Sequence, residues 1–138
     1  MKTAKELYEI TLAQKPKLVA KVLDGVKEHV IKSCERDAEL GAVYYTIHLQ
    51  RAHAFIKEEL LKECIKLAKE FEKENFKVYI DDIGNGYYTN LSMTFSWNGQ
   101  IEEGLLKRYG KRYHLYDTDN GIDLENVSIE ESEISEEM

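Results

Sequence analysis

The chain has 138 residues, of which 43% are hydrophobic and 33% are charged, and its formal net charge is −7. This length and hydrophobic content predict one globular domain with a buried core rather than a disordered chain. No apolar run approaches the roughly 18 residues of a membrane span, and the start, MKTAKELYEI, has no hydrophobic signal region. We therefore expect a cytoplasmic protein.

The charged residues are unevenly distributed along the chain. Nine acidic residues and no lysine or arginine follow Tyr116, whereas residues 1–116 carry 19 basic and 17 acidic residues. Because the net acidity belongs to the C-terminal end, it does not exclude an anionic partner for the rest of the chain. We expect residues 1–129 to form a single α+β domain and residues 130–138, EESEISEEM, to form an acidic disordered tail.

The first helix is expected to follow TAKE, residues 3–6, which has the spacing of a capping box. Leu7, Ile10 and Leu12 would form its apolar side. Pro16 fits poorly inside a helix but suits a first turn, so we expect the first helix to end there and a second one to begin.

Two longer amphipathic helices are expected after this point. The first extends to about Glu39, with Gly41 as its left-handed stop, and the second covers residues 52–74. Their apolar residues recur at three- and four-residue steps: Val19, Leu23, Val26 and Val30 in the first, and Ile56, Leu60, Cys64, Leu67, Ala68 and Phe71 in the second.

Three strands are expected, at residues 42–49, 76–80 and 91–97, because apolar and polar residues alternate there. IGNG, residues 83–86, is expected to form the turn between the last two. One face of the first strand would carry Val43, Tyr45, Ile47 and Leu49, and the other Tyr44, Thr46 and His48.

These elements predict an α+β fold in the order helix, helix, strand, helix, strand, strand. Two long amphipathic helices would pack on one face of a small mixed sheet. The strands at 42–49 and 76–80 are joined through a helix and are expected to lie parallel with a right-handed crossover, whereas 76–80 and 91–97 would form an antiparallel hairpin. The other sheet face would carry Ser92, Thr94 and Ser96.

Two further elements are expected beyond residue 97. Asn98 would cap a short helix that ends at Gly110. Residues 112–129 resemble a second hairpin around Asn120–Gly121, although their apolar residues fit no register with a two-residue turn.

Two side-chain pairs raise the question of metal binding. Cys34 and Cys64 occupy apolar-facing helical positions without metal-ligand spacing, so we expect buried free thiols. Asp81 and Asp82 are adjacent carboxylates, but adjacent strand residues point to opposite faces, and aspartates are common before turns. We therefore expect a solvated turn there and no metal ion.

His48 and His53 flank the junction between the first strand and the following helix. Such a pair could bind a metal ion or act as acid and base, but no third ligand lies near in sequence, which favours structural or solvated roles. No serine, cysteine or threonine stands in a nucleophile motif. We expect a non-enzymatic protein without a cofactor; the alternative is a metal-dependent enzyme using these histidines with Asp81 and Asp82.

The segment at residues 107–116, KRYGKRYHLY, combines four cations with three tyrosines. Cations neutralise phosphates, and tyrosine rings offer stacking faces to unpaired bases. We therefore expect a protein that binds single-stranded nucleic acid, RNA first, with help from the sheet face that carries Tyr44 and His48. The candidate binding residues are Lys107, Arg108, Tyr109, Lys111, Arg112, Tyr113, His114 and Tyr116.

Other interpretations of this segment stay open. Its cations could complement a helix dipole and its tyrosines could be half-buried, while the acidic tail competes for the same cations. The alternative function is a protein-binding host modulator or inhibitor that uses its acidic C-terminal region as a mimic of nucleic-acid charge.

The chain resembles, in the style of its sequence, small accessory proteins encoded by phages of low-GC Gram-positive bacteria. The likeness rests on the helices KPKLVAKVLDGVKEHVIK and IKEELLKECIKLAKEFEKENFKV, the strands VYYTIHL and YYTNLSMTFSW, and the acidic end SIEESEISEEM. It implies a non-enzymatic binder that modulates a host nucleic-acid or protein target, and it assigns no functional residue.

Overall fold

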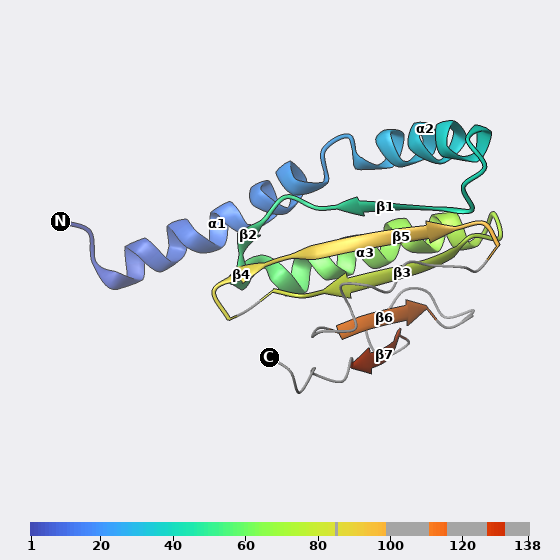
Figure 1. Ribbon diagram of the computed structural model, residues 1–138. Coiled ribbons are helices and arrows are strands. Elements are labelled where there is room, and N and C mark those ends of the chain that lie inside the picture. Colours follow the sequence, from blue (N-terminus) through green and yellow to red (C-terminus); the bar gives the residue numbers. More distant parts are fainter. Residues whose placement is uncertain (85, 99–110, 116–126, 132–138) are drawn as a thin grey trace, which may run out of the picture.

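The computed structural model describes residues 1–84, 86–98, 111–115 and 127–131, and it has the expected α+β fold (Figure 1). The elements are α1 (Ala4–Leu23), α2 (Val26–Glu39), β1 (Tyr44–His48), β2 (Ala52–His53), the 3-10 helix η1 (Ala54–Ile56), α3 (Lys57–Glu72), β3 (Lys77–Asp82), β4 (Tyr88–Thr89), β5 (Leu91–Ser96), β6 (Lys111–Leu115) and β7 (Val127–Glu131). The predicted order of helices and strands is therefore confirmed.

The main sheet has the strand order β1-β5-β3-β6-β7, and β2 pairs with β4 in a separate two-stranded sheet. The hairpin of β3 and β5 is confirmed. The expectation of a mixed sheet is wrong, because every pair of strands in the described part of the chain is antiparallel. β1 and β3 do run in the same direction, but β5 lies between them and pairs antiparallel with both.

The boundary between the first two helices differs from the expectation. α1 continues through Pro16 to Leu23, and the chain turns at Asp24 and Gly25 instead. Asp24 is extended and Gly25 has a φ of +70°, a left-handed conformation that glycine adopts without steric cost. Proline removes one backbone hydrogen bond from a helix but does not have to end it.

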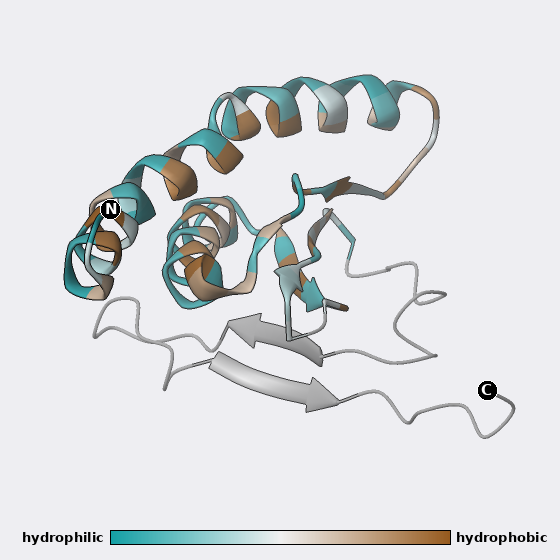
Figure 2. Ribbon diagram, turned by 90° about the vertical axis from the view of Figure 1, so that its left-hand side faces the viewer, coloured by the Kyte–Doolittle hydropathy of each residue, from teal (hydrophilic) through white to brown (hydrophobic). Residues whose placement is uncertain are grey.

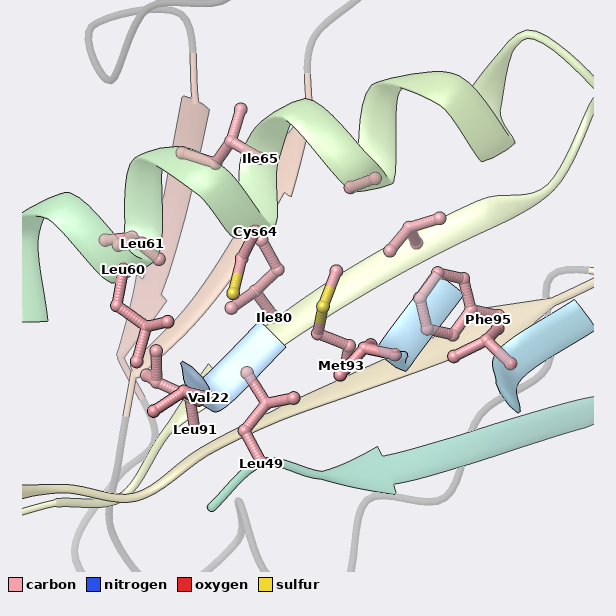
Figure 3. Packing of buried hydrophobic residues seen from close by; sticks show 14 of the residues in the cluster. Val22, Leu49, Leu60, Leu61, Cys64, Ile65, Ile80, Leu91, Met93 and Phe95 are labelled. Atoms are coloured by element: carbon pink, nitrogen blue, oxygen red, sulfur yellow. The ribbon is translucent and has the colours of Figure 1, made fainter. Parts of the chain in front are cut away.

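The hydrophobic core lies between the helices and one face of the sheet. α3 lies behind β5 and β3 in the view of Figure 1, and α2 packs against β1. Figure 3 shows Leu60 and Cys64 of α3 pointing toward Ile80 and Leu91 of the sheet, all of them buried. The ring centroids of Phe71 on α3 and Phe95 on β5 are 4.7 Å apart, so aromatic packing closes the other end of this layer.

The first half of α1 lies outside this core. The helix has the predicted capping box, in which Thr3 Oγ1 accepts from the Glu6 amide and Glu6 Oε1 accepts from the Thr3 amide. Residues 1–14 are all exposed, and burial begins only near Val19. α1 therefore extends beyond the sheet toward the N-terminus (Figure 1), with hydrophobic segments along its exposed part (Figure 2).

The C-terminal pair of strands agrees with the expected second hairpin. β6 and β7 pair antiparallel, with Leu115 opposite Val127, so the connection between them is residues 116–126. The predicted turn at Asn120–Gly121 and the predicted helix after Asn98 lie outside the described residues. Strand β7 includes Glu130 and Glu131, the first two residues of the segment expected to form the tail.

The turn after β3 brings two stretches of backbone into close contact at Gly84. A Cβ atom on Gly84 would lie 2.6 Å from the Tyr88 carbonyl oxygen and 2.9 Å from the Asn90 nitrogen. We predict that Gly84→Ala lowers the free energy of unfolding by about 1–3 kcal/mol, because backbone atoms have to shift.

Urea unfolding measures this effect. Gly86→Ala is the matched control, since a Cβ atom there meets nothing within 4 Å. Equal unfolding midpoints for the two variants would show that the close approach at Gly84 is absent.

Candidate nucleic-acid interface

The predicted binding segment is only partly described by the structure. Lys111, Arg112, Tyr113 and His114 lie in β6, whose pairing with β3 and β7 is described. The other four candidate residues, Lys107, Arg108, Tyr109 and Tyr116, lie outside the described residues. The site is therefore built from the register of β6 in the sheet.

The register divides the segment between the two faces of the sheet. Tyr113 faces Ile80 on β3 and Ile129 on β7, and Ile80 in turn faces Met93, so Tyr113 occupies a position on the helix-covered face. Because side chains alternate along a strand, Lys111 shares this face. Arg112 and His114 occupy positions on the opposite face, which we call the polar face.

The register thus places two of these four residues on each face of the sheet.

Each of the two β6 cations has an acidic residue at the facing position on both sides. Arg112 lies between Asp81 on β3 and Glu130 on β7. One residue earlier, Lys111 lies between Asp82 and Glu131. Opposite charges at directly facing positions of an antiparallel pair attract one another. The register therefore places an acidic residue at every position that faces Lys111 or Arg112.

The polar face carries two cross-strand rows that include residues of β6. One row holds His48, Ser92, Asp81, Arg112 and Glu130, and the next holds Thr46, Thr94, Tyr79, His114 and Ser128. The alternation predicted for Tyr44, Thr46 and His48 is confirmed by their pairing with β5. Two hydroxyl groups of this face, Thr46 Oγ1 and Thr94 Oγ1, hydrogen-bond at 2.8 Å.

The centre of the polar face is less accessible than its flanks. Ser92, Thr94 and Ser96 on β5 are 8%, 2% and 0% exposed. The residues on either side of them, including Tyr44 on β1 and Tyr79 on β3, are half-buried, and His48 is exposed. A ligand on this face would therefore contact the side chains of β1 and β3 rather than the hydroxyls of β5.

Sequence reasoning did not single out two residues of this face, Lys77 and Tyr79 on β3. The Lys77 ammonium lies 6.0 Å from the centroid of the Tyr79 ring, at the limit of a cation–π interaction. The alternation of KVYID, residues 77–81, was the signal that could have found them. It puts Lys77, Tyr79 and Asp81 on the same face as the hydroxyls of β5.

The two aspartates at the end of β3 lie in the strand and not in a solvated turn, so that expectation is wrong for Asp82. Asp82 is 7% exposed, and its carboxylate binds the Lys57 ammonium at 3.2 Å and accepts from the Gly84 amide at 3.0 Å. Asp81 lies on the other face, opposite Ser92. The two carboxylates therefore do not converge on one ion.

The histidines expected to have structural or solvated roles are both exposed. His48 ends β1, and His53 Nδ1 accepts a hydrogen bond from the Phe55 amide at 3.2 Å, which caps η1. Within the part of the chain that the structure describes, no three histidine, cysteine, aspartate or glutamate side chains are grouped so that they could hold a metal ion.

Another histidine, His29 on α2, has a specific partner that the sequence did not reveal. Its Nε2 atom lies 2.8 Å from the Tyr45 hydroxyl on β1 and 3.4 Å from Ser33 Oγ. This contact joins α2 to the edge strand of the sheet on the helix-covered face. We therefore assign His29 to the packing of α2 rather than to the polar face.

Comparison of the chain with protein-family models, with curated proteins and with solved structures finds no match. Among the described residues, no helix has the length and apolar character needed to cross a membrane. What the protein binds therefore has to be argued from its own residues.

The Lys57–Asp82 ion pair generates a prediction about stability. Replacing Lys57 with methionine removes the ammonium that binds the nearly buried Asp82 carboxylate, so we expect a loss of about 2 kcal/mol in the free energy of unfolding. Lys62→Met is the control, because Lys62 pairs with Glu58 in an exposed position and should cost less than about 0.5 kcal/mol. If urea unfolding gave the same loss of unfolding free energy for both variants, the Lys57–Asp82 pair would not stabilise the protein more than an exposed pair does.

The two cysteines are free and buried, as predicted, and this generates a prediction about pH. Burial raises the pKa of Cys34 to about 11 and that of Cys64 to about 12 from an ordinary value of 9.0. Between pH 9 and 11 both thiols ionise in the unfolded chain, but they stay largely protonated in the folded protein. Stability should therefore fall as pH rises from about 9 toward 11.

Alkylation with iodoacetamide at pH 8 measures how far burial suppresses the ionisation of these thiols. The thiolate fraction of Cys34 should be about a hundredfold below that of an ordinary thiol, so labelling should be slow until guanidinium unfolds the chain. Rapid labelling of the folded protein would contradict the burial of these residues.

Proposed function

We propose that this is a non-enzymatic cytoplasmic protein that binds single-stranded nucleic acid, RNA first, on the polar face of its sheet. The observation that carries the proposal is the pairing of β6 beside β3, which adds the positions of Arg112 and His114 to a face that already holds Tyr44, His48 and Tyr79. The free thiols of Cys34 and Cys64 are compatible with a reducing compartment.

The chemistry of this face suits unpaired bases better than a duplex. Tyrosine and histidine rings stack on bases of any sequence, and half-buried rings lose little conformational freedom when they do so. Hydroxyl groups and an arginine add hydrogen bonds to sugars and phosphates. Among the described elements, the helices that contact the sheet pack on its other face, so single strands could reach β1 and β3 through their half-buried side chains.

The acidic residues beside Arg112 would limit the affinity. Asp81 and Glu130 occupy the facing positions, so a phosphate has to displace the attraction of two carboxylates. Binding should therefore be weak at physiological ionic strength and should strengthen at low salt, where phosphate contacts contribute most.

The first prediction from this proposal separates two adjacent cations. Arg112→Glu should weaken the binding of a short RNA by about tenfold or more, because it replaces a cation of the polar face with an acid. Lys111→Glu should have a much smaller effect, because Lys111 occupies a position on the helix-covered face. Fluorescence anisotropy at low salt, with RNA and single-stranded DNA of the same sequence, measures both.

Three results contradict the proposal. These are no binding by the wild-type protein at low salt, equal losses in the two charge variants, and a larger loss for Lys111→Glu. Circular dichroism before each titration shows whether a variant keeps its fold.

Asp81→Asn tests the competition between phosphate and carboxylate. Removing this negative charge beside Arg112 should strengthen RNA binding several-fold, and the gain should shrink as salt is added. Glu58→Gln is the control, because Glu58 lies on α3 and pairs with Lys62. Weaker binding by Asp81→Asn would mean that Asp81 itself contacts the ligand.

A second candidate function is a protein-binding modulator that presents acidic residues to a basic surface. The C-terminal region favours it, since nine acidic residues and no lysine or arginine follow Tyr116. Capture of a basic partner should be lost when the acidic end is removed, whereas RNA binding should become stronger. The truncation should end after Glu131, because a 1–129 chain would cut β7 and change the sheet as well as the charge.

A further inference from the structure

The two-stranded sheet of β2 and β4 continues the polar face beyond the end of β1. Figure 1 shows both strands at the end of the main sheet where β1 ends and β5 begins. The Ile83 amide donates to the Asn90 carbonyl, so the ladder between β3 and β5 extends to Asn90. Because side chains alternate, Asn90 and Tyr88 occupy positions on the side that carries Ser92. His53 directly faces Tyr88 and shares this side.

Arg51 lies at this end of the polar face, over a tyrosine ring. Its side chain is exposed, and its guanidinium lies 4.3 Å from the centroid of the Tyr88 ring. A cation–π contact restrains a guanidinium and leaves its N–H groups able to donate to an anion. Within the part of the chain that the structure describes, Arg51 forms no ion pair with a carboxylate.

The strands around Arg51 carry no acidic side chains. Residues 40–57 and 83–101, which include β1, β2, β4 and β5, hold none of the 26 acidic residues of the chain. Asp81 on β3 is separated from β1 by β5. Arg112, by contrast, has acidic residues at both facing positions. We therefore expect an anion to meet less competition from acidic side chains at Arg51 than at Arg112.

Two exposed histidines flank this cation in the chain. His48 ends β1 on the polar face, and His53 lies in β2 opposite Tyr88. Histidine rings can stack on unpaired bases next to a phosphate that a neighbouring cation binds. We call His48, Arg51, His53 and Tyr88 the β2–β4 corner. It combines one guanidinium with aromatic rings on strands that have no carboxylate.

We propose that the β2–β4 corner is the principal phosphate-binding site for single-stranded RNA, with the Arg51 guanidinium as the donor. The inference rests on the proposed function, since it assumes that the polar face binds a single strand, and it names the cation that contributes most. Tyr88 is a positioning residue, because it contacts the guanidinium and not the phosphate. Arg112 then supplies a weaker contact at the other side of the same face.

Fluorescence anisotropy with a short single-stranded RNA, repeated over a range of salt concentrations, tests this assignment. Arg51→Gln should weaken binding about tenfold at low salt, because a charge-assisted hydrogen bond is lost. The slope of log affinity against log salt should also fall by about 0.7, the value for one phosphate contact on a single strand. Arg51→Lys keeps the charge and should keep the slope of the wild-type protein.

Two arginine variants serve as comparisons for Arg51→Gln. Arg36→Gln is the matched control, because Arg36 lies on α2 and pairs with Asp37 at 2.9 Å, so RNA affinity should stay nearly unchanged. Arg112→Gln removes the cation that has acidic residues at its facing positions. It should cost less affinity than Arg51→Gln.

The outcomes separate this inference from the proposed function. If Arg112→Gln weakens RNA binding as much as Arg51→Gln or more, the polar face binds RNA but the β2–β4 corner is not its principal anchor, and the inference is overturned. An Arg51→Gln variant with the salt slope of the wild-type protein also overturns it. No RNA binding by the wild-type protein overturns the proposed function itself. A loss confined to Arg51→Gln supports the inference and removes Arg112 from the site.

Discussion

The structure depends on the packing of α3 against the paired strands β3 and β5. Leu60, Cys64 and Ala68 are completely or almost completely buried on α3, as are Val78 and Ile80 on β3 and Leu91, Met93 and Phe95 on β5. Because side chains alternate along a strand, this packing fixes which residues of the sheet point away from the helices. The composition of the polar face is therefore determined by the packing of α3 against β3 and β5.

The register of β6 and β7 then decides how the charges of the C-terminal region are distributed. A basic segment and an acidic end in one chain suggest either a phosphate site or mutual neutralisation. The pairing of β6 places acidic residues at the positions that face Lys111 and Arg112 on both neighbouring strands. Because Arg112 occupies a position on the polar face, we propose it as the cation that a phosphate would meet there, in competition with the acidic residues at the facing positions.

The sequence was most informative where alternation or helical spacing was strong. It predicted the helices, the strands near residues 42–49, 76–80 and 91–97, and the capping box at Thr3. It failed at Pro16 because one proline is a weaker constraint than the packing of Val19 and Val22, which keeps α1 continuous. The prediction of a mixed sheet was also wrong. β5 lies between β1 and β3, and which strands become neighbours depends on contacts between distant residues, which local sequence patterns do not encode. For the candidate site, the residue types could be predicted from the sequence, but their division between the two faces of the sheet required the register of β6.

The most direct measurement is a titration of the isotope-labelled protein with a short single-stranded RNA, followed by two-dimensional NMR. The account predicts chemical-shift changes at the amides of β1, β3 and β6, with small changes along α3. The absence of shifts at low salt, or shifts confined to α1, would contradict it. Shifts in α1 alone would show that the exposed helix, and not the polar face, is the surface that meets nucleic acid.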